Sequence, residues 1–428
     1  MTSQLQISAV GADPALLDLP WQVPLEEWPA DQLAALPRGL SRHVVRFAHL
    51  SGRVVAVKEI GAELARREYE LLRLLRRLDV PCVEPVGVVS GRQTPAGRPL
   101  DPALVTRHLQ FSLPYRALFS QSLRPDTAKR LVDALAVLLV RLHLSGFFWG
   151  DVSLSNTLFR RDAGSFAAYL VDAETGELHD ELSDGQREYD LELARVNIAG
   201  ELMDLEAGGL LDPVRDLADE TGATDAVTTS QRIVDRYRSL WAELTEPESF
   251  ESGERWRMEA RIRRLNELGF DVGELAITTD VGGTSVQIQP KVVDAGHHSR
   301  RLLRLTGLDV GENQARRLLN DLDSYRAAND RQGESEEIVA HDWLTQVFEA
   351  VVTAVPRELR RKLEPAEIFH EVLENRWYLS ERRGRDVPLR DAVDDYVRNV
   401  LPGKPDEAAI LGVDTRALPV IAPPGPVQ

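Results

Sequence analysis

One short stretch, Trp149 to Phe159, constrains the fold of this chain more than any other feature of its sequence. It follows a mostly apolar segment of helical character, Ala128 to His143, and it ends in the strand-like residues 156–159. Asp151 and Asn156 therefore stand five positions apart on a loop between a helix and a strand. A carboxylate and an amide at this spacing can face one centre, where the acid orients a hydroxyl group and the amide oxygen holds a metal ion.

This loop alone is a weak indication of a catalytic site, because Asp and Asn are also common in ordinary turns. The D-x-x-x-x-N spacing is nevertheless that of phosphoryl-transfer catalytic loops. Its meaning depends on three further charged residues, two before the loop and one after it.

Lys58 is the first of these residues. Residues 43–49 and 53–60 are rich in β-branched and aromatic side chains around Ser51 and Gly52, which predicts two strands joined by a turn. Lys58 lies near the end of the second strand and is the only lysine among the first 128 residues. A lysine is a compact point charge that suits phosphate oxygens, although exposed strand lysines are also common.

Glu68 lies ten residues after Lys58, on a helix that leucines at helical spacing predict from Ala62 to Leu78. Such a helix, packed on the strands, would aim Glu68 at Lys58 and fix its ammonium group. The alternative is that Glu68 belongs to a solvated charged face. Further predicted strands at 83–89 and 103–109 complete a small sheet with one helix.

Asp172 is the third residue, at the end of an apolar strand and sixteen positions beyond Asn156. Strand-end carboxylates are ready metal ligands beside a second oxygen donor. Two hairpin strands that bracket residues 160–165 would place Asp172 and Asn156 at the same end of the hairpin.

Taken in order over about residues 38–205, these features resemble the protein-kinase-like superfamily. Within it they are most similar to small-molecule kinases and to lipopolysaccharide-core (Kdo) sugar kinases. The resemblance implies that Lys58 binds the phosphates of ATP and that Glu68 is its helix partner. It also implies that Asp151 is the catalytic acid of the loop, and that Asn156 and Asp172 bind magnesium (Mg2+).

The same resemblance assigns the remaining nucleotide contacts. Thr106, Arg107, His108 and Leu109 match the hinge that contacts adenine through backbone groups. The glycine-rich loop is poor, since only Gly39 remains of it. Ser41 and Arg42 are then candidates to contact the phosphates instead.

Departures from the family pattern favour a small-molecule acceptor over a protein. Trp149 and Gly150 replace the His-Arg that precedes the catalytic aspartate of protein kinases, and Asp172-Ala-Glu174 replaces D-F-G. No A-P-E motif comes after it. Control by a phosphorylated activation loop is therefore not expected.

The C-terminal half also resembles a known family. Residues 265–271, 296–302, 312–321 and 369–373 are similar to an actinobacterial domain of unknown function (DUF), which is found behind lipopolysaccharide-kinase-like regions and which ends here near residue 400. The resemblance implies a bacterial cytoplasmic protein and no assigned reaction. Because most actinobacteria lack lipopolysaccharide, it does not imply a lipopolysaccharide substrate.

Basic residues in this half allow a second kind of site. His297, His298, Arg300, Arg301 and Arg304 could bind an anion together with Arg316 and Arg317 on the next helix. A helix surface is the interpretation that we favour, and a metal site at adjacent histidines is less favoured still.

Composition excludes several functions. The net charge of −17 argues against general nucleic-acid binding, although residues 51–150 carry +6 and residues 151–250 carry −15. A solvated acidic surface is the first interpretation of that second region. The other is a surface that repels anionic partners or attracts cationic ones. No apolar run is long enough for a membrane span, no secretory signal is apparent, and the single cysteine, Cys82, favours a reducing cytoplasm.

We therefore predict an α+β protein, with a two-lobed protein-kinase-like domain followed by a mainly helical α+β C-terminal domain. The expected parts are an N-terminal arm (1–37), an N-lobe (38–109), a C-lobe (110–230), the C-terminal domain of unknown function (231–401) and a mobile tail (402–428). The expected activity is transfer of a phosphoryl group from ATP, with Mg2+, to a hydroxyl of an acceptor that the sequence does not name. A nucleotide-binding pseudokinase scaffold and a nucleotidyl (AMP) transferase on the same fold are the alternatives, and the oligomeric state is left open.

Overall fold

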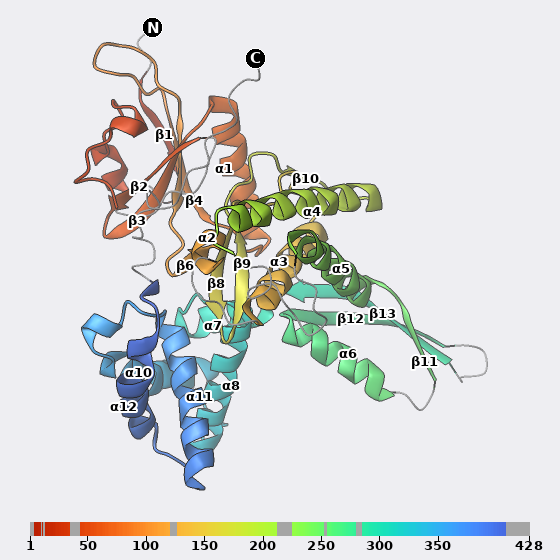
Figure 1. The fold of residues 1–428 in the computed structure, drawn as a ribbon. Coiled ribbons are helices and arrows are strands. Elements are labelled where there is room, and N and C mark those ends of the chain that lie inside the picture. Colours follow the sequence, from red (N-terminus) through yellow and green to blue (C-terminus); the bar gives the residue numbers. More distant parts are fainter. Residues whose placement is uncertain are drawn as a thin grey trace.

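The chain begins with a five-stranded antiparallel sheet in the order β1-β4-β5-β3-β2 (Figure 1). Its strands are β1 (Gln6–Ala9), β2 (Val44–Leu50), β3 (Arg53–Glu59), β4 (Glu84–Ser90) and β5 (Ala103–Arg107). Ser51 and Gly52 have φ angles of 47° and 77°, which suits the tight β2–β3 hairpin turn. The computed structural model describes residues 4–9, 11, 13–34, 43–119, 126–211, 225–251, 255–279 and 285–407.

The helix α1 (Ala62–Arg77) packs on one face of this sheet and agrees closely with the predicted span. Ala65 and Tyr69 of the helix form a small core with Ile60, Val88 and Leu104. Its opposite side adds leucines to the core of the second lobe. The helix therefore connects the two lobes and places its polar residue Glu68 between them.

The other face of the sheet is covered by the segment before β2. Trp21 and Trp28 are 2% and 4% exposed and pack edge to face, with their ring centroids 5.3 Å apart. The buried Arg92 guanidinium holds the segment in place by donating to the carbonyl oxygens of Trp21 and Val23 at 3.1 and 2.8 Å. The sheet consequently has apolar layers on both faces.

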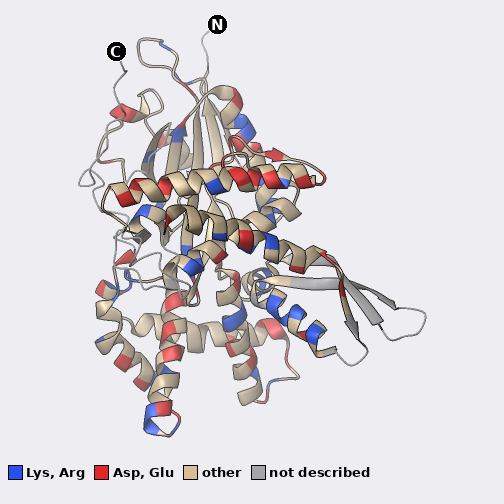
Figure 2. Ribbon diagram, turned by 45° about the vertical axis from the view of Figure 1, so that its right-hand side comes forward, with Lys and Arg blue, Asp and Glu red and all other residues tan. Residues whose placement is uncertain are grey.

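The second lobe is built around α3 (Asp126–Leu144), whose leucines are almost completely buried except for the terminal Leu144, because α5, β9 and β7 pack against the helix. Its other elements are β6 (Ser112–Pro114), α2 (Tyr115–Phe119), β7 (Phe147–Phe148), β8 (Thr157–Asp162), β9 (Ser165–Leu170), β10 (Glu177–Leu178), α4 (Asp184–Ala207) and α5 (Ala226–Thr245). Acidic residues are frequent along α4 (Figure 2). Among the described helices, none is both long and apolar enough to cross a membrane.

The C-terminal part starts with a second antiparallel sheet and continues as helices. The sheet has the order β11-β13-β12 and consists of β11 (Glu248–Glu251), β12 (Phe270–Thr279) and β13 (Ser285–Ala295), with α6 (Arg255–Glu267) beside it. The helices are α7 (His297–Thr306), α8 (Glu312–Ala328), α9 (Glu336–Trp343), α10 (Glu349–Ala354), α11 (Pro365–Arg383) and α12 (Leu389–Asn399). Trp343, Phe348 and Phe369 form the aromatic centre of their core.

The predicted fold class is confirmed, because a sheet-containing two-lobed region precedes a mainly helical one. The helical periodicity of residues Glu251 to Leu268 predicts one further helix, but α6 begins at Arg255, because residues 248–251 pair with β13 instead. That pairing joins residues distant in sequence, so local periodicity does not reveal it. Of the predicted tail, residues 408–428 lie outside the described part of the chain. So do Gly282 and Gly283, where the sequence predicts the turn of a hairpin.

Candidate active site

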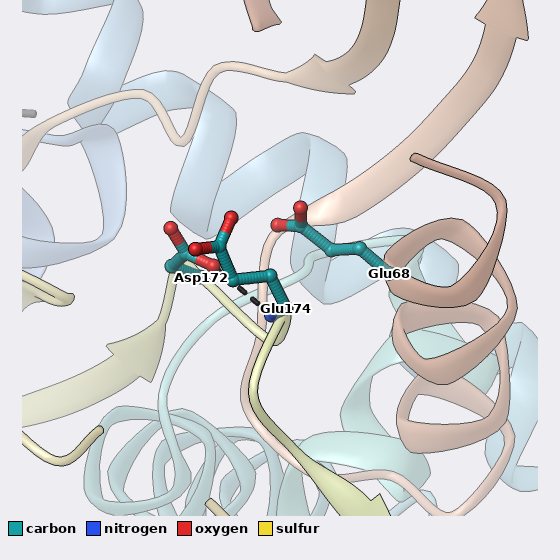
Figure 3. A group of neighbouring side chains, drawn as sticks. All are labelled: Glu68, Asp172 and Glu174. Atoms are coloured by element: carbon teal, nitrogen blue, oxygen red, sulfur yellow. Dashed lines mark hydrogen bonds between the residues drawn. The ribbon is translucent and has the colours of Figure 1, made fainter. Parts of the chain in front are cut away.

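The ammonium group of Lys58 is the centre of the candidate site. Its Nζ atom donates to Glu68 Oε2 at 3.1 Å, to Asp172 Oδ2 at 2.7 Å and to Glu174 Oε2 at 2.9 Å. Lys58 comes from β3, Glu68 from α1, and the two other acids from the segment after β9. Figure 3 shows the three carboxylates converging on one space, and their ligand atoms lie within 4.8 Å of one another. The structure thus joins both lobes at one cation.

The electrostatics of this cluster result from its burial. Burial lowers the pKa of Lys58, but the carboxylates of Glu68 and Asp172 outweigh that effect and hold it above its ordinary value. Burial raises the pKa of Glu68 to about 8, and the charge of Asp172 acts in the same direction. Even without a charge on Glu68, Asp172 and Glu174 place two carboxylates beside one cation, and this excess negative charge favours a further cation.

Asp151 lies on the loop between β7 and β8, as the sequence predicts. Asn156 Nδ2 donates to the backbone oxygen of Asp151 at 3.0 Å and to its carboxylate Oδ2 at 3.2 Å. Asn197 on α4 donates to Val152 O at 3.1 Å and lies 3.5 Å from Asp151 Oδ1. These contacts fix the direction of the Asp151 carboxylate.

The β8–β9 hairpin brings Asn156 and Asp172 to the same end. Thr157 pairs with Leu170 in its register, and the backbone N–H of Val171 donates to Asn156 O at 3.0 Å. Asn156 therefore lies directly beside the strand that leads into Asp172. This is the juxtaposition that the hairpin spacing predicts.

These side chains fit a magnesium ion by their chemistry. The amide nitrogen of Asn156 is used by Asp151, so its amide oxygen is the atom left for a metal. Asp172 contributes a carboxylate, and Mg2+ prefers such hard oxygen ligands. Among the residues that the structure describes, Glu68, Asp172 and Glu174 are the one group of three metal-ligating side chains close together.

The helix α4 holds the loop that carries Asp151, through residues that the sequence did not single out. The fully buried Asp190 accepts the backbone N–H groups of Trp149 and Gly150 at 2.7 and 2.8 Å. Glu201 accepts those of Leu154 and Ser155 at 2.6 and 2.9 Å. Together with Asn197, these acids form one stripe of α4. The available signal was their spacing, since polar residues at 190, 197 and 201 alternate with buried apolar ones along the same face.

Trp149 links the loop to the segment that carries Asp172. Its indole is fully buried, and Nε1 donates to Asp172 O at 3.0 Å. Thr175 Oγ1 donates to Trp149 O at 2.8 Å. Gly150 has a φ angle of 75°, and a Cβ atom there would lie 3.1 Å from the Phe148 ring. Trp149 and Gly150 are therefore required by packing at this junction.

The predicted hinge residues lie at the end of the first sheet. Thr106 and Arg107 are still paired with both β3 and β4, and the N–H of His108 donates to Val54 O at 3.0 Å. Arg107 also pairs with Glu84 at 2.6 Å, away from the Lys58 cluster by strand alternation. Leu109 O accepts from Ser112 Oγ at 2.7 Å. Ser41 and Arg42 lie outside the described residues.

Three of the basic residues considered as an anion site, His298, Arg300 and Arg301, contact carboxylates instead. His298 and Glu312 are 2.7 Å apart, Arg300 lies 3.3 Å from Asp79, and Arg301 pairs with Glu336. Glu312 also accepts the first N–H groups of α7. This arrangement supports a structural role for the group.

A strand lysine that donates to a helix glutamate on one lobe and to a strand-end aspartate on the other is the arrangement of the protein-kinase-like fold. The sequence comparisons are more specific. Residues 45–202 match the Lipopolysaccharide kinase (Kdo/WaaP) family, and residues 239–401 match a domain of unknown function, DUF4032. The predicted fusion of these two regions is confirmed.

Two further comparisons cover curated proteins and solved structures. No curated protein matches the chain. A solved structure, "WaaP in complex with acyl carrier protein", is similar at 17% sequence identity and a TM-score of 0.36, over 61% of this chain and 99% of that chain.

Proposed function

We propose that this protein is an ATP- and Mg2+-dependent phosphotransferase that acts on a hydroxyl group of a small-molecule acceptor. The observation that carries the proposal is the double contact of Lys58 with Glu68 and Asp172, at 3.1 and 2.7 Å. Kinase catalysis requires both the lysine–glutamate pair and the metal-binding aspartate to be in place. Here one ammonium group connects them.

Each residue then has a defined task. Lys58 would bind nucleotide phosphates, and Asn156 and Asp172 would hold Mg2+, which neutralises phosphate charge when bound. Asp151 would orient the acceptor hydroxyl and take its proton late, because the transferred phosphoryl group has a loose transition state. Asn197 and Asp190 would keep Asp151 in position.

The acceptor class rests on the segment after Asp172. Only residues 173–183 separate Asp172 from α4, and part of this segment pairs with β7. The segment contains no A-P-E motif, and Trp149 and Gly150 occupy the positions of the His-Arg pair. These features support a small-molecule acceptor and argue against a long, phosphorylated activation loop. A cytoplasmic location is part of the proposal, since Cys82 is buried and unpaired.

The test is the fate of ATP in a bacterial metabolite extract, with wild type and Asp151→Ala compared. ADP release by wild type and its loss in the variant are expected. Asp235→Ala, an exposed acid on α5, is the matched control. Turnover that survives Asp151→Ala unchanged would refute the assigned role of Asp151.

The product also separates the alternatives. Release of pyrophosphate in place of ADP would identify a nucleotidyl transferase. Stabilisation by magnesium-ATP without any consumption would identify a scaffold, an outcome consistent with the contact of Glu174 on Lys58.

A further inference from the structure

The tip of the β8–β9 hairpin is held by the C-terminal domain. Asp162, 3% exposed, caps α8 from outside that helix. Its Oδ1 accepts the N–H of Gln314 at 2.7 Å, and its Oδ2 accepts both the N–H and the side-chain amide of Asn313 at 3.1 Å. A carboxylate at a helix N-terminus is stabilised by free N–H groups and by the helix dipole. In this chain the two partners are 151 or more residues apart in sequence.

Ion pairs on both sides of Asp162 extend this contact. Arg160 makes a two-pronged interaction with Glu364, one arm of which measures 3.0 Å between Nε and Oε2. Arg161 Nε lies 2.5 Å from Glu407 Oε1. The side chains of Arg160 and Glu364 are only 12% and 10% exposed, so water screens their attraction weakly. Three consecutive residues of the hairpin, Arg160, Arg161 and Asp162, thus contact the C-terminal domain.

The turn of the hairpin is enclosed as well. The N–H of Ala163 donates to Glu367 Oε2 at 3.2 Å. Gly311 approaches Asp162 so closely that a Cβ atom there would lie 2.5 Å from Asp162 Oδ1. This contact therefore leaves no space for a side chain and fixes the hairpin at its tip.

The opposite end of the same hairpin carries Asn156 and Asp172. Residues Thr157 to Asp162 pair with Ser165 to Leu170 without interruption, so the hairpin transmits the position of its tip to its base. Under the proposed function, this base is the magnesium site. The tip and the base therefore form one unit.

We propose that the C-terminal domain positions the magnesium-binding residues of the kinase-like domain by clamping the β8–β9 hairpin through Arg160, Asp162 and Glu364. These are positioning residues, which act on the metal through Asn156 and Asp172. The inference rests on the proposed function and assigns a role to the DUF4032 domain within it. Lys58 belongs to the other lobe, so nucleotide binding without metal does not depend on the clamp.

The experiment measures ATP binding to the full chain by calorimetry, with Mg2+ and with EDTA. The gain in ATP affinity on adding Mg2+ should be about tenfold smaller for Arg160→Glu than for wild type, as expected when the support of a metal ligand is removed. Binding in EDTA should stay within about twofold of wild type, since it relies on Lys58. Arg160→Glu combined with Glu364→Arg should recover most of the Mg2+ effect.

Arg264→Glu is the matched control, because it breaks an ion pair with Glu243 between α6 and α5 that does not involve the hairpin. Glu364→Gln is a milder second variant, and it is measured separately from Arg160→Glu. Circular dichroism first checks that each variant has the native fold. Full retention of the Mg2+ effect in both Arg160→Glu and Glu364→Gln, with only a lower unfolding temperature, would overturn the inference. So would a folded double variant without recovery. If wild type binds no ATP in either condition, the proposed function itself fails, and the inference fails with it.

Discussion

Glu174 and Lys58 are joined by a 2.9 Å hydrogen bond at a position where D-F-G kinases have a glycine. The same carboxylate oxygen, Oε2, lies 3.0 Å from His43 Nε2, at the start of β2. Glu174 is 8% exposed, and its carboxylate lies beside Lys58, where the proposed function places nucleotide phosphates. Under the proposed function, the phosphates would have to displace Glu174 from Lys58.

Glu174→Gln should therefore bind magnesium-ATP about three- to tenfold more tightly than wild type, because it removes a competing charge from Lys58. Calorimetry at constant Mg2+ measures the difference. Glu177→Gln, an exposed neighbour, is the control. Weaker binding in Glu174→Gln would instead make Glu174 a contributor to the metal site.

Asp190→Asn should slow turnover by about a hundredfold or more, because an amide group would face the N–H groups of Trp149 and Gly150 and displace Asp151. Steady-state kinetics should show this loss in kcat and little change in the KM for ATP, since Lys58 keeps its contacts. Glu188→Gln, exposed on the same helix, should behave as wild type. An equal rise in KM would contradict the specific effect on the loop.

Gly311→Ala should destabilise the protein by about 1–3 kcal/mol, because the new methyl group would overlap Asp162 Oδ1. Chemical denaturation measures the loss. Gly333→Ala is a matched control, since its added Cβ meets nothing within 4 Å. Equal stabilities of the two variants would show that Asp162 moves away from the added methyl group without a loss of stability.

His370 provides a pH dependence in the C-terminal domain. It is 4% exposed on α11, and burial together with the charge of Arg317 lowers its pKa from 6.5 to about 4. The neighbouring Glu371 has the opposite effect, Lys404 acts like Arg317, and Glu374 is 3.8 Å away. The stability that depends on a neutral His370 is therefore fully present above pH 6.5, the pKa of histidine in the unfolded chain.

That stability should be lost as the pH falls from 6.5 through 4, by at most about 3 kcal/mol. His370→Gln should remove this part of the pH dependence, which denaturation curves at pH 7 and pH 4 measure. His341→Gln, at an exposed position of α9, serves as the control. Identical pH dependence in wild type and His370→Gln would refute the shifted pKa.

The sequence by itself determined much of the fold around the loop that carries Asp151 and Asn156. Local patterns predicted β2, β3, α1 and the β8–β9 hairpin, because strand alternation, helical leucine spacing and turn residues act over few positions. The order of Lys58, Glu68, Asp151, Asn156 and Asp172 predicted a shared site. The structure joins Lys58 to Glu68 and Asp172, and Asn156 to Asp151. Their catalytic roles remain proposals.

Only the tertiary structure decided how these residues are supported. Asp190 and Glu201 resemble surface acids of an acidic helix in sequence, yet they hold the loop that carries Asp151. In sequence, Glu174 only replaces the glycine of D-F-G, yet it contacts Lys58. Arg160 and Asp162 resemble exposed charged residues of a hairpin, yet they contact the C-terminal domain. Each of these contacts joins residues far apart in the chain. A carboxylate carries no local signal of its partner, because the partner is selected by packing and by the low dielectric constant of the buried site.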